Sequence, residues 1–523
     1  MLNLLSNLRI SGLIDNVDNF IDIGAQTLTR NTHNEIKRFI NAFGGTVTNE
    51  EIKDWYRKNP PFPAARRIFE KTPITYDCLD SSSETLSSVL GKNFDLNFDK
   101  IPDEMRNKYD FVCDIGTLEH VFNQENSFSC CHDLTSKDGY MLHFLPTIGF
   151  SDAAYFNCLP RLFFDIAEYN DYSEEGMWSN FSYSEDLTEW DPELLRYIDV
   201  STRSMHDINI VSLWRRTSNK SFQKPVIDEK KVHLSGYRRH ILTILCDAFR
   251  YGMITEINSV ADLGQQPLDM TGAEAQVQSL VELMGGPASH APITDPASLF
   301  GAAGKKHETI SFSDVAHDRN LAEKNKYDLV TNIGVSDKIF DFGRMFERMH
   351  AMTAPGGAML HVVPFFGNDD NSYYTIMPTL MEELAIVNGY KILGAWLHVD
   401  GLNSALYWDD NHFRSLDINI KDLDGSAYYI ALFQKVHDTE FNIPFQFKYR
   451  ELRSEHAAQR YRLNLNGQNV VDWPLRKIDS RRELVGRIGG QYSRGPLTKP
   501  RALYKTRFLP LSGAKNPKNK FPG

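Results

Sequence analysis

Cysteine is scarce in this chain, and the few cysteines present do not have the spacing of a metal site or a disulfide framework. The 523 residues contain 6 cysteines, and no two of them form a Cys-x-x-Cys pair or stand at a ligand spacing from histidine. Zinc sites require such paired ligands, so the sequence predicts no metal site. Without a disulfide framework a reducing compartment is favoured, and we expect a cytoplasmic protein.

Long hydrophobic runs are also missing. No apolar stretch approaches the roughly 20 residues of a membrane-spanning helix, so no span is predicted. The first residues, MLNLLSNLRISGLIDN, have neither a basic leading region nor a small-residue cleavage site, which argues against a signal peptide.

The composition is that of a globular protein with more than one core. Hydrophobic residues make up 41% of the chain and aromatic residues 12%, and a chain of this length predicts about two to four domains. The formal net charge is −11, yet basic residues outnumber acidic ones from Thr439 onward. This asymmetry indicates a C-terminal extension with a partner of its own.

Two stretches of the sequence resemble one another. Residues 107–172 and 325–390 align without a gap, and about a third of their positions are identical, which indicates an internal repeat at the scale of a domain. In the first stretch, apolar runs at 109–113 and 140–145 flank a helical segment, which predicts a strand–helix–strand unit.

Glycine turns follow a predicted strand in both halves. The run 19–23 leads into Asp22-Ile23-Gly24-Ala25-Gln26, and 260–266 repeats the pattern as VADLGQQ. A glycine directly after a strand lets the backbone pass close to a ligand.

Acidic residues follow the next predicted strands. Asp80 ends the strand predicted at 74–79, where an acid can grip a ribose diol, and Asp295 after 292–294 is its expected counterpart. Asp95 stands near a predicted third strand, with Asp314 as its analogue. Solvated loop carboxylates or helix caps are the alternative for each of these acids.

The order of these motifs resembles a class I S-adenosylmethionine-dependent methyltransferase. The most specific part is KYDFVCDIGTLEHVF followed by KDGYMLHFLP, which is similar to a bacterial group with a GTLEHVFN signature, often predicted to act on glycans or small metabolites. The family usually carries Gly-x-Gly in the first turn, whereas this chain has Gly24 and then Gln26.

The resemblance implies an α/β fold of two tandem Rossmann-like class I methyltransferase domains, each with a mostly parallel sheet, plus the basic extension. It implies S-adenosyl-L-methionine as the cofactor, with the carried-over contacts Asp22, Gly24, Gln26, Asp80, Asp95, Asp114 and Gly116. We predict boundaries at 1–218 for a catalytic domain, 219–240 for a linker and lead-in helix, 241–437 for a diverged domain and 438–523 for the extension.

The two halves differ where a proton acceptor would stand. The first has Glu119-His120 and the second has Asp337-Lys338, and only an imidazole accepts a proton near neutral pH without a large shift. We therefore expect His120, with Glu119, to be catalytic. His132 and His143 recur in the second half as His350 and His361, which favours a structural role for them.

Three functions compete at this point. The leading one is O-methylation of a hydroxyl on a sugar, glycan or small metabolite. A second is a methyltransferase docked to nucleic acid or another polyanion through the basic tail. A third is a non-catalytic binding or assembly protein built from two relic domains. The sequence does not predict the oligomeric state.

Overall fold

The computed structural model shows two α/β units built to one plan. It describes all residues except 25–30, 59–64, 81–88, 91–93, 150–153, 182–186, 191–207, 228–231, 233, 289–290, 312–313, 315–323, 367–371, 401–404, 408–425, 447–459 and 462–523. We call the elements α1 to β8 the N-terminal unit and the elements α9 to β16 the C-terminal unit.

The N-terminal unit begins with a helix and then alternates strands and helices. Its elements are α1 (Leu2–Ile10), β1 (Asn19–Ile23), α2 (His33–Ala42), α3 (Asn49–Lys58), α4 (Ala65–Phe69), β2 (Thr75–Leu79), β3 (Tyr109–Ile115), α5 (Gln124–Leu134), β4 (Thr135–Ile148), β5 (Phe156–Cys158), α6 (Pro160–Asn170), β6 (Tyr172–Phe181), β7 (Leu187–Glu189) and β8 (Ile208–Arg216). One-turn 3-10 helices lie at Asp103–Met105 and Leu118–His120.

The C-terminal unit follows the same sequence of elements. These are α9 (Arg239–Arg250), β9 (Ser259–Leu263), α10 (Glu274–Leu283), α11 (Pro296–Ala302), β10 (Lys306–Ile310), β11 (Tyr327–Ile333), a 3-10 turn (Ser336–Lys338), α13 (Phe342–Met352), β12 (Thr353–Phe366), β13 (Tyr374–Ile376), α14 (Pro378–Val387), β14 (Lys391–Val399), β15 (Ala405–Tyr407) and β16 (Ala427–Gln434).

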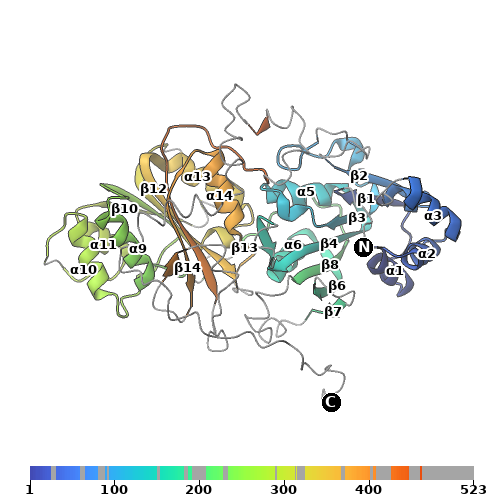
Figure 1. Ribbon diagram of the computed structural model, residues 1–523, viewed down its shortest axis with the longest axis horizontal. Helices are drawn as coiled ribbons and strands as arrows, with labels where there is room; N and C mark the ends of the chain where they lie inside the picture. The colour runs from blue at the N-terminus through green and yellow to red at the C-terminus, as the bar shows by residue number, and fades with distance from the viewer. Residues whose placement is uncertain are drawn as a thin grey trace, which may run out of the picture.

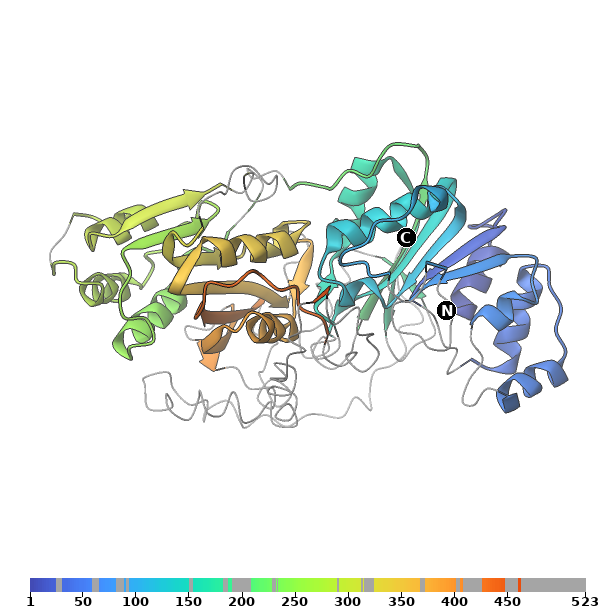
Figure 2. The same ribbon diagram turned by 90° about the horizontal axis from the view of Figure 1, so that it is seen from above.

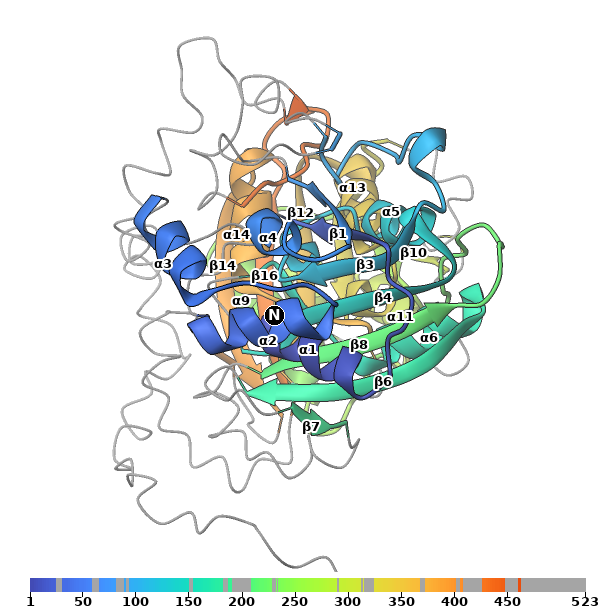
Figure 3. The ribbon, with the colours of Figure 1, turned by 90° about the vertical axis from the view of Figure 1, so that its right-hand side faces the viewer.

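Each unit contains a seven-stranded sheet with the equivalent strand order. The orders are β2-β1-β3-β4-β8-β6-β7 and β10-β9-β11-β12-β16-β14-β15. In the first sheet β2, β1, β3, β4 and β6 run in one direction, and β8 and β7 run in the other. Figure 3 shows this succession from the end of the molecule where α1 and α2 cover the sheet. The predicted α/β class with mostly parallel sheets is confirmed.

Both faces of the sheets are covered, which explains the continuous apolar runs. Along β3, Phe111 and Cys113 enter a core under the outer helices, whereas Val112 enters a core on the opposite face. A parallel strand buried on both faces must be apolar at successive positions.

The inner faces of the two sheets share one core. Figures 1 and 2 show α1–α3 and α9–α11 at opposite ends of the molecule, with α5, α6, α13 and α14 toward the middle. A single buried cluster contains Val112 and Phe163 of the N-terminal unit together with Val330 and Leu380 of the C-terminal unit. Burial of apolar surface therefore holds the two units together.

The contact between the units is reciprocal. Strand β5 pairs with β13 in antiparallel register, and Asn157 lies opposite Thr375, its own counterpart at the 218-residue offset of the repeat. The N–H of Leu159 donates to the carbonyl of Tyr373 at 2.9 Å, and the N–H of Met377 donates to that of Tyr155 at 2.9 Å. The same surface of each unit thus meets its equivalent, as in a two-fold dimer.

Two sequence predictions about strands were wrong. The second strand of the C-terminal unit is β10 and not 292–294, because Asp295 caps α11 in a capping box with Ser298. The third strand predicted near Asp95 is also absent from the described residues there, because 94–98 form a turn before β3.

Candidate functional site

The sheet order of the N-terminal unit has a switch point between β1 and β3. The chain runs from β1 outward to β2 and then returns to the other side of β1 as β3. Ligands of open α/β sheets bind outside the carboxyl ends of the strands at such a point. Here Gly24 and Gly116 end the two strands with φ angles of +85° and +73°, a region that favours glycine.

Asp22 lies at this edge and is almost wholly buried. Its Oδ2 accepts a 2.6 Å hydrogen bond from the Tyr76 hydroxyl, whereas its Oδ1 has no N–H or O–H donor in the described part of the chain, and the weakly donating Cys113 thiol also acts on the carboxylate. Burial raises the pKa of Asp22 to about 7, although the Tyr76 hydrogen bond opposes the shift. A buried acceptor with unused capacity is a place where a ligand donor or cation can bind.

The backbone at Gly24, after β1, lies close to the turn that follows β3. A Cβ atom at Gly24 would lie 2.2 Å from Thr117 Oγ1, and that hydroxyl donates to the carbonyl of Ile23 at 2.7 Å. The N–H of Gly24 donates to the carbonyl of Leu79 at 2.7 Å. Glycine therefore lets the turns after β1 and β3 pack directly on each other.

Asp114 holds the turn after β3. Its Oδ1 accepts from the N–H groups of Thr117 and Leu118, both at 3.3 Å, and its Oδ2 lies 3.1 Å from His143 Nδ1. Both side chains are buried. His143, for which the sequence favoured a structural role, thus contacts the carboxylate of Asp114. Asp114 influences the site indirectly, because it holds the backbone of the turn in place.

Glu119 and His120 form the 3-10 turn that follows. Glu119 is buried, and the His120 side chain is 18% exposed with Nε2 3.5 Å from Glu119 Oε1. The N–H of Tyr155 donates to the carbonyl of Glu119 at 3.0 Å. An imidazole beside a carboxylate, partly open to solvent, can accept a proton.

The remaining predicted cofactor residues are distributed as follows. Asp80 follows Leu79 of β2, which pairs with Ile23, so Asp80 lies at the same edge as Asp22 and the β3 turn. Gln26 lies outside the described residues. Asp95 is buried, and its carboxylate accepts from the N–H of Asn97 at 2.9 Å and from the Tyr461 hydroxyl at 2.8 Å. No sequence pattern indicated the Tyr461 contact.

In the C-terminal unit, polar side chains of the chain itself contact both carboxylate oxygens of the equivalent aspartate, Asp262. Asp262 Oδ1 accepts from the hydroxyls of Tyr237 at 2.6 Å and Thr331 at 2.5 Å, and its Oδ2 lies 2.9 Å from His307 Nε2. Tyr237 is fully buried and comes from the segment before α9. No counterpart of this tyrosine contacts Asp22 among the described residues.

The same segment covers both glycine turns of the C-terminal unit. A Cβ atom at Gly264 would lie 2.9 Å from Leu234 Cδ1, and one at Gly334 would lie 3.0 Å from Ser235 Oγ. The N–H of Tyr237 donates to the carbonyl of Pro267 at 2.8 Å. We call residues 234–237 the plug segment, because it lies against both glycine turns at the switch point of this unit.

Three side chains of the site are also replaced in the C-terminal unit. The N–H of Gly264 bonds to Ile310 as that of Gly24 bonds to Leu79, so Ser311 stands where the N-terminal unit has Asp80. Asn332 stands for Asp114. Lys338 stands for His120, and its Nζ is buried 2.6 Å from Asp337 Oδ2.

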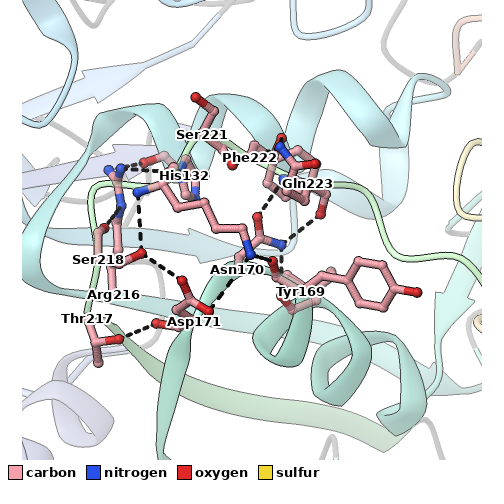
Figure 4. A network of polar contacts seen from close by, with 12 residues as sticks. His132, Tyr169, Asn170, Asp171, Arg216, Thr217, Ser218, Ser221, Phe222 and Gln223 are labelled. Atoms are coloured by element: carbon pink, nitrogen blue, oxygen red, sulfur yellow. Dashed lines mark hydrogen bonds and ion pairs between the residues drawn. The ribbon is translucent and has the colours of Figure 1, made fainter.

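His132 has the structural role that the sequence favoured. Its Nδ1 lies 2.5 Å from the Tyr172 hydroxyl and its Nε2 2.8 Å from the carbonyl of Lys220, and burial lowers its pKa to about 4. Figure 4 shows this ring within a network that fastens residues 216–223 to the ends of α5 and α6. His350 repeats the pattern with Tyr390 and Thr439.

Two side chains that flank β5, those of Tyr155 and Arg161, lie at the contact between the units. Tyr155 is fully buried, and its hydroxyl donates to Glu383 at 2.5 Å. Arg161 Nε lies 3.3 Å from Asp165 Oδ2, which also accepts from the Tyr373 hydroxyl.

No described helix is long and apolar enough to cross a membrane. Within the described ranges, no cluster of three or more His, Cys, Asp or Glu side chains could hold a metal ion.

Comparison with known proteins gives no family model and no curated protein that matches the sequence. Solved structures that resemble it include methyltransferases. A Burkholderia thailandensis 1,6-didemethyltoxoflavin-N1-methyltransferase with bound S-adenosylhomocysteine is 12% identical, with 38% of this chain and 78% of that chain covered and a TM-score of 0.24.

Two further structures cover more of the chain. A Haemonchus contortus phosphoethanolamine N-methyltransferase 2 complex with S-adenosylhomocysteine is 11% identical and covers 83% of this chain and 100% of its own, at a TM-score of 0.23. A T. thermophilus 16S rRNA N2 G1207 methyltransferase with AdoMet is 12% identical over 83% and 92%, at a TM-score of 0.19. At these identities and TM-scores the likenesses do not establish a function for this chain.

Proposed function

We propose that this protein is an S-adenosyl-L-methionine-dependent methyltransferase that binds its cofactor in the N-terminal unit and methylates a hydroxyl of a sugar, glycan or small metabolite. The observation that carries the proposal is the contrast between equivalent aspartates. In the described part of the chain, Asp22 keeps a buried oxygen that no N–H or O–H group reaches, whereas Asp262 is contacted by Tyr237, Thr331 and His307.

The residues at the switch point suit this cofactor. Asp80, beside β1 at the end of β2, would hold the ribose hydroxyls, as acids at this position do in dinucleotide folds. Asp22, together with the turns of Gly24 and Gly116, would bind the methionine end, whose ammonium and sulfonium charges favour carboxylate and carbonyl oxygens. Bound cofactor would supply an electrophilic methyl group.

The chain's contribution to catalysis would be orientation and proton removal. Bound cofactor would supply the methyl group and leave as S-adenosylhomocysteine, and His120 would take the proton of the acceptor hydroxyl. Glu119, with Oε1 3.5 Å from His120 Nε2, would stabilise the imidazolium that results. Asp114 and His143 would fix the turn that carries this pair.

Calorimetry with S-adenosylhomocysteine tests the proposal. We expect one site per chain, weakened about tenfold or more in Asp80→Ala, since a charge-assisted bidentate contact would be lost. Ser311→Ala, the matched change in the C-terminal unit, should leave the affinity unchanged. Two sites would contradict the assignment to one unit, and no binding would favour a relic binding or assembly protein.

We further propose that the chain arose by duplication, with domains at 1–218 and 241–437, a linker and lead-in helix at 219–240 and an extension at 438–523. The equivalent strand orders and the reciprocal β5–β13 contact support this division. A reducing compartment such as the cytoplasm belongs to the proposal, because the six cysteines are buried and form no disulfide.

Polyanion binding through the basic extension remains a separate hypothesis, since 447–459 and 462–523 lie outside the described residues. A salt-dependent shift of polynucleotide mobility in the presence of the full chain would support it, and unchanged mobility at low salt would dismiss it.

A further inference from the structure

The end of the turn that carries Glu119 and His120 is held by one side chain. Asn97 Oδ1 accepts from the N–H groups of Phe122 and Asn123, both at 2.9 Å. Asn123 Nδ2 donates in return to the carbonyl of Asn97 at 3.1 Å. The position of Asn97 therefore fixes where the 118–123 turn ends and α5 begins.

Asn97 is in turn held by a residue that is distant in the sequence. Its Nδ2 donates to the Tyr461 hydroxyl at 2.8 Å, and that hydroxyl donates to Asp95 Oδ2 at 2.8 Å. Asp95 Oδ1 closes the ring by accepting from the N–H of Asn97 at 2.9 Å. Tyr461, Asn97 and Asp95 are all buried, so each lost hydrogen bond would leave a polar atom without water.

The residue before Tyr461 strengthens this attachment. Arg460 makes two hydrogen bonds to the Asp99 carboxylate, at 2.6 and 2.7 Å, and its guanidinium lies 4.6 Å from the Phe98 ring centroid. A bidentate arginine–carboxylate pair is among the stronger polar contacts of proteins.

Tyr461 also contacts the C-terminal unit. Its ring lies 5.0 Å from that of Phe98 and 5.4 Å from that of Phe445, in a cluster that includes Ile386 and Val387 at the end of α14. The residue thus joins the 95–99 turn of the N-terminal unit to the helix of the other unit.

We propose that Tyr461 is a positioning residue: it holds Asn97, and through Asn97 it fixes the turn that presents Glu119 and His120. The C-terminal extension is then part of the catalytic unit and not only a tail with an external partner. The meaning for catalysis depends on the proposed function, but the positioning itself does not.

Hydrogen exchange measured by mass spectrometry on the full chain tests this inference. In Tyr461→Phe the ring remains and the hydroxyl is lost, so we expect exchange in peptides covering 118–126 to rise about tenfold, with β9 and β11 unchanged. Tyr169→Phe is the matched control, because its hydroxyl donates to the carbonyl of Val226 in an exposed hydrogen bond.

The outcomes separate the two proposals. Unchanged exchange in 118–126, or an equal rise throughout both units, would overturn the positioning role. Arg460→Ala should give a smaller rise in the same peptides, because the Tyr461 hydrogen bonds remain. S-adenosylhomocysteine titration of the same samples tests the proposed function independently, since failure of the wild type to bind leaves the exchange result intact.

Discussion

The hydroxyl of Tyr155 donates to the carboxylate of Glu383 across the contact between the two units, at 2.5 Å. The N–H of Tyr155 donates to the carbonyl of Glu119, and its carbonyl accepts from the N–H of Met377. One residue therefore connects the candidate catalytic turn to the C-terminal unit. The equivalent Tyr373 donates from its hydroxyl to Asp165 and from its N–H to Asp337.

This arrangement predicts a stability loss of similar size from either tyrosine. Tyr155→Phe and Tyr373→Phe should each lower the free energy of unfolding by about 1–3 kcal/mol, because each removes a hydrogen bond that a buried tyrosine hydroxyl donates to a carboxylate of the other unit. Urea unfolding measures the change. Tyr169→Phe, at an exposed hydrogen bond, should cost less than about 1 kcal/mol. Equal losses in all three variants would contradict a special role for the contact.

The raised pKa of Asp22 predicts a pH-dependent stability. In the unfolded chain the carboxyl loses its proton near its usual pKa of 3.8, whereas the folded protein keeps it until about pH 7. The unfolded state is therefore favoured progressively as the pH rises from about 4 to 7, and the deficit then stays constant. Asp22→Asn removes this penalty while its amide oxygen can still accept from Tyr76.

We expect Asp22→Asn to be more stable than the wild type by about 2–4 kcal/mol at pH 8 and to differ little at pH 4. Thermal unfolding across this range measures the difference. His132 and His361, whose pKa values are lowered by burial, change both proteins alike and cancel in the comparison. A gap that is constant with pH would refute the raised pKa of Asp22.

The sequence predicted the strands that are buried on both faces. Tyr109–Ile115 and Asn19–Ile23 are apolar because helices cover both sides of the sheet, and that pattern is visible without a structure. Strand β10 was missed because Lys306–Ile310 lies at the sheet edge with three exposed positions, and so it lacks an apolar run. Pro292–Thr294 was mistaken for it because a helix cap and a strand end both place Asp after a short apolar stretch.

The polar partners of the site were beyond sequence reasoning for a different reason. The contact of Tyr461 with Asp95 joins residues 366 positions apart, and the contact of Tyr237 with Asp262 depends on how the segment before α9 crosses the sheet. No periodicity records such contacts. The lead-in helix expected within 219–240 in fact begins only at Arg239, and residues 235–238 are non-helical and lie over the glycine turns.

Because the plug segment covers Gly264, we expect substitution of Gly264 to lower stability and substitution of the equivalent Gly24 to lower ligand affinity. Gly264→Ala forces a Cβ against Leu234 at a φ of +68°, so it should destabilise the protein by about 1–3 kcal/mol and leave S-adenosylhomocysteine affinity within twofold. Gly24→Ala forces a Cβ against Thr117 in the candidate site and should abolish binding. Calorimetry and urea unfolding on both variants check this, and reduced affinity in Gly264→Ala would place the ligand in the wrong unit.

Because Lys338 occupies the position equivalent to His120, we expect substitution of His120 to affect catalysis and substitution of Lys338 to affect stability. His120→Gln should lower methyl transfer by about 10²–10⁴-fold, because the proton acceptor is lost, while S-adenosylhomocysteine affinity stays within a few fold. Transfer can be measured with labelled S-adenosylmethionine against fractionated sugars and metabolites. Lys338→Met should instead destabilise the chain by about 3–5 kcal/mol, because Asp337 would keep a buried charge without its ammonium partner. Its transfer rate at a temperature where it stays folded should match the wild type. Full turnover in His120→Gln would remove the imidazole from the reaction and leave orientation as the whole contribution of the turn.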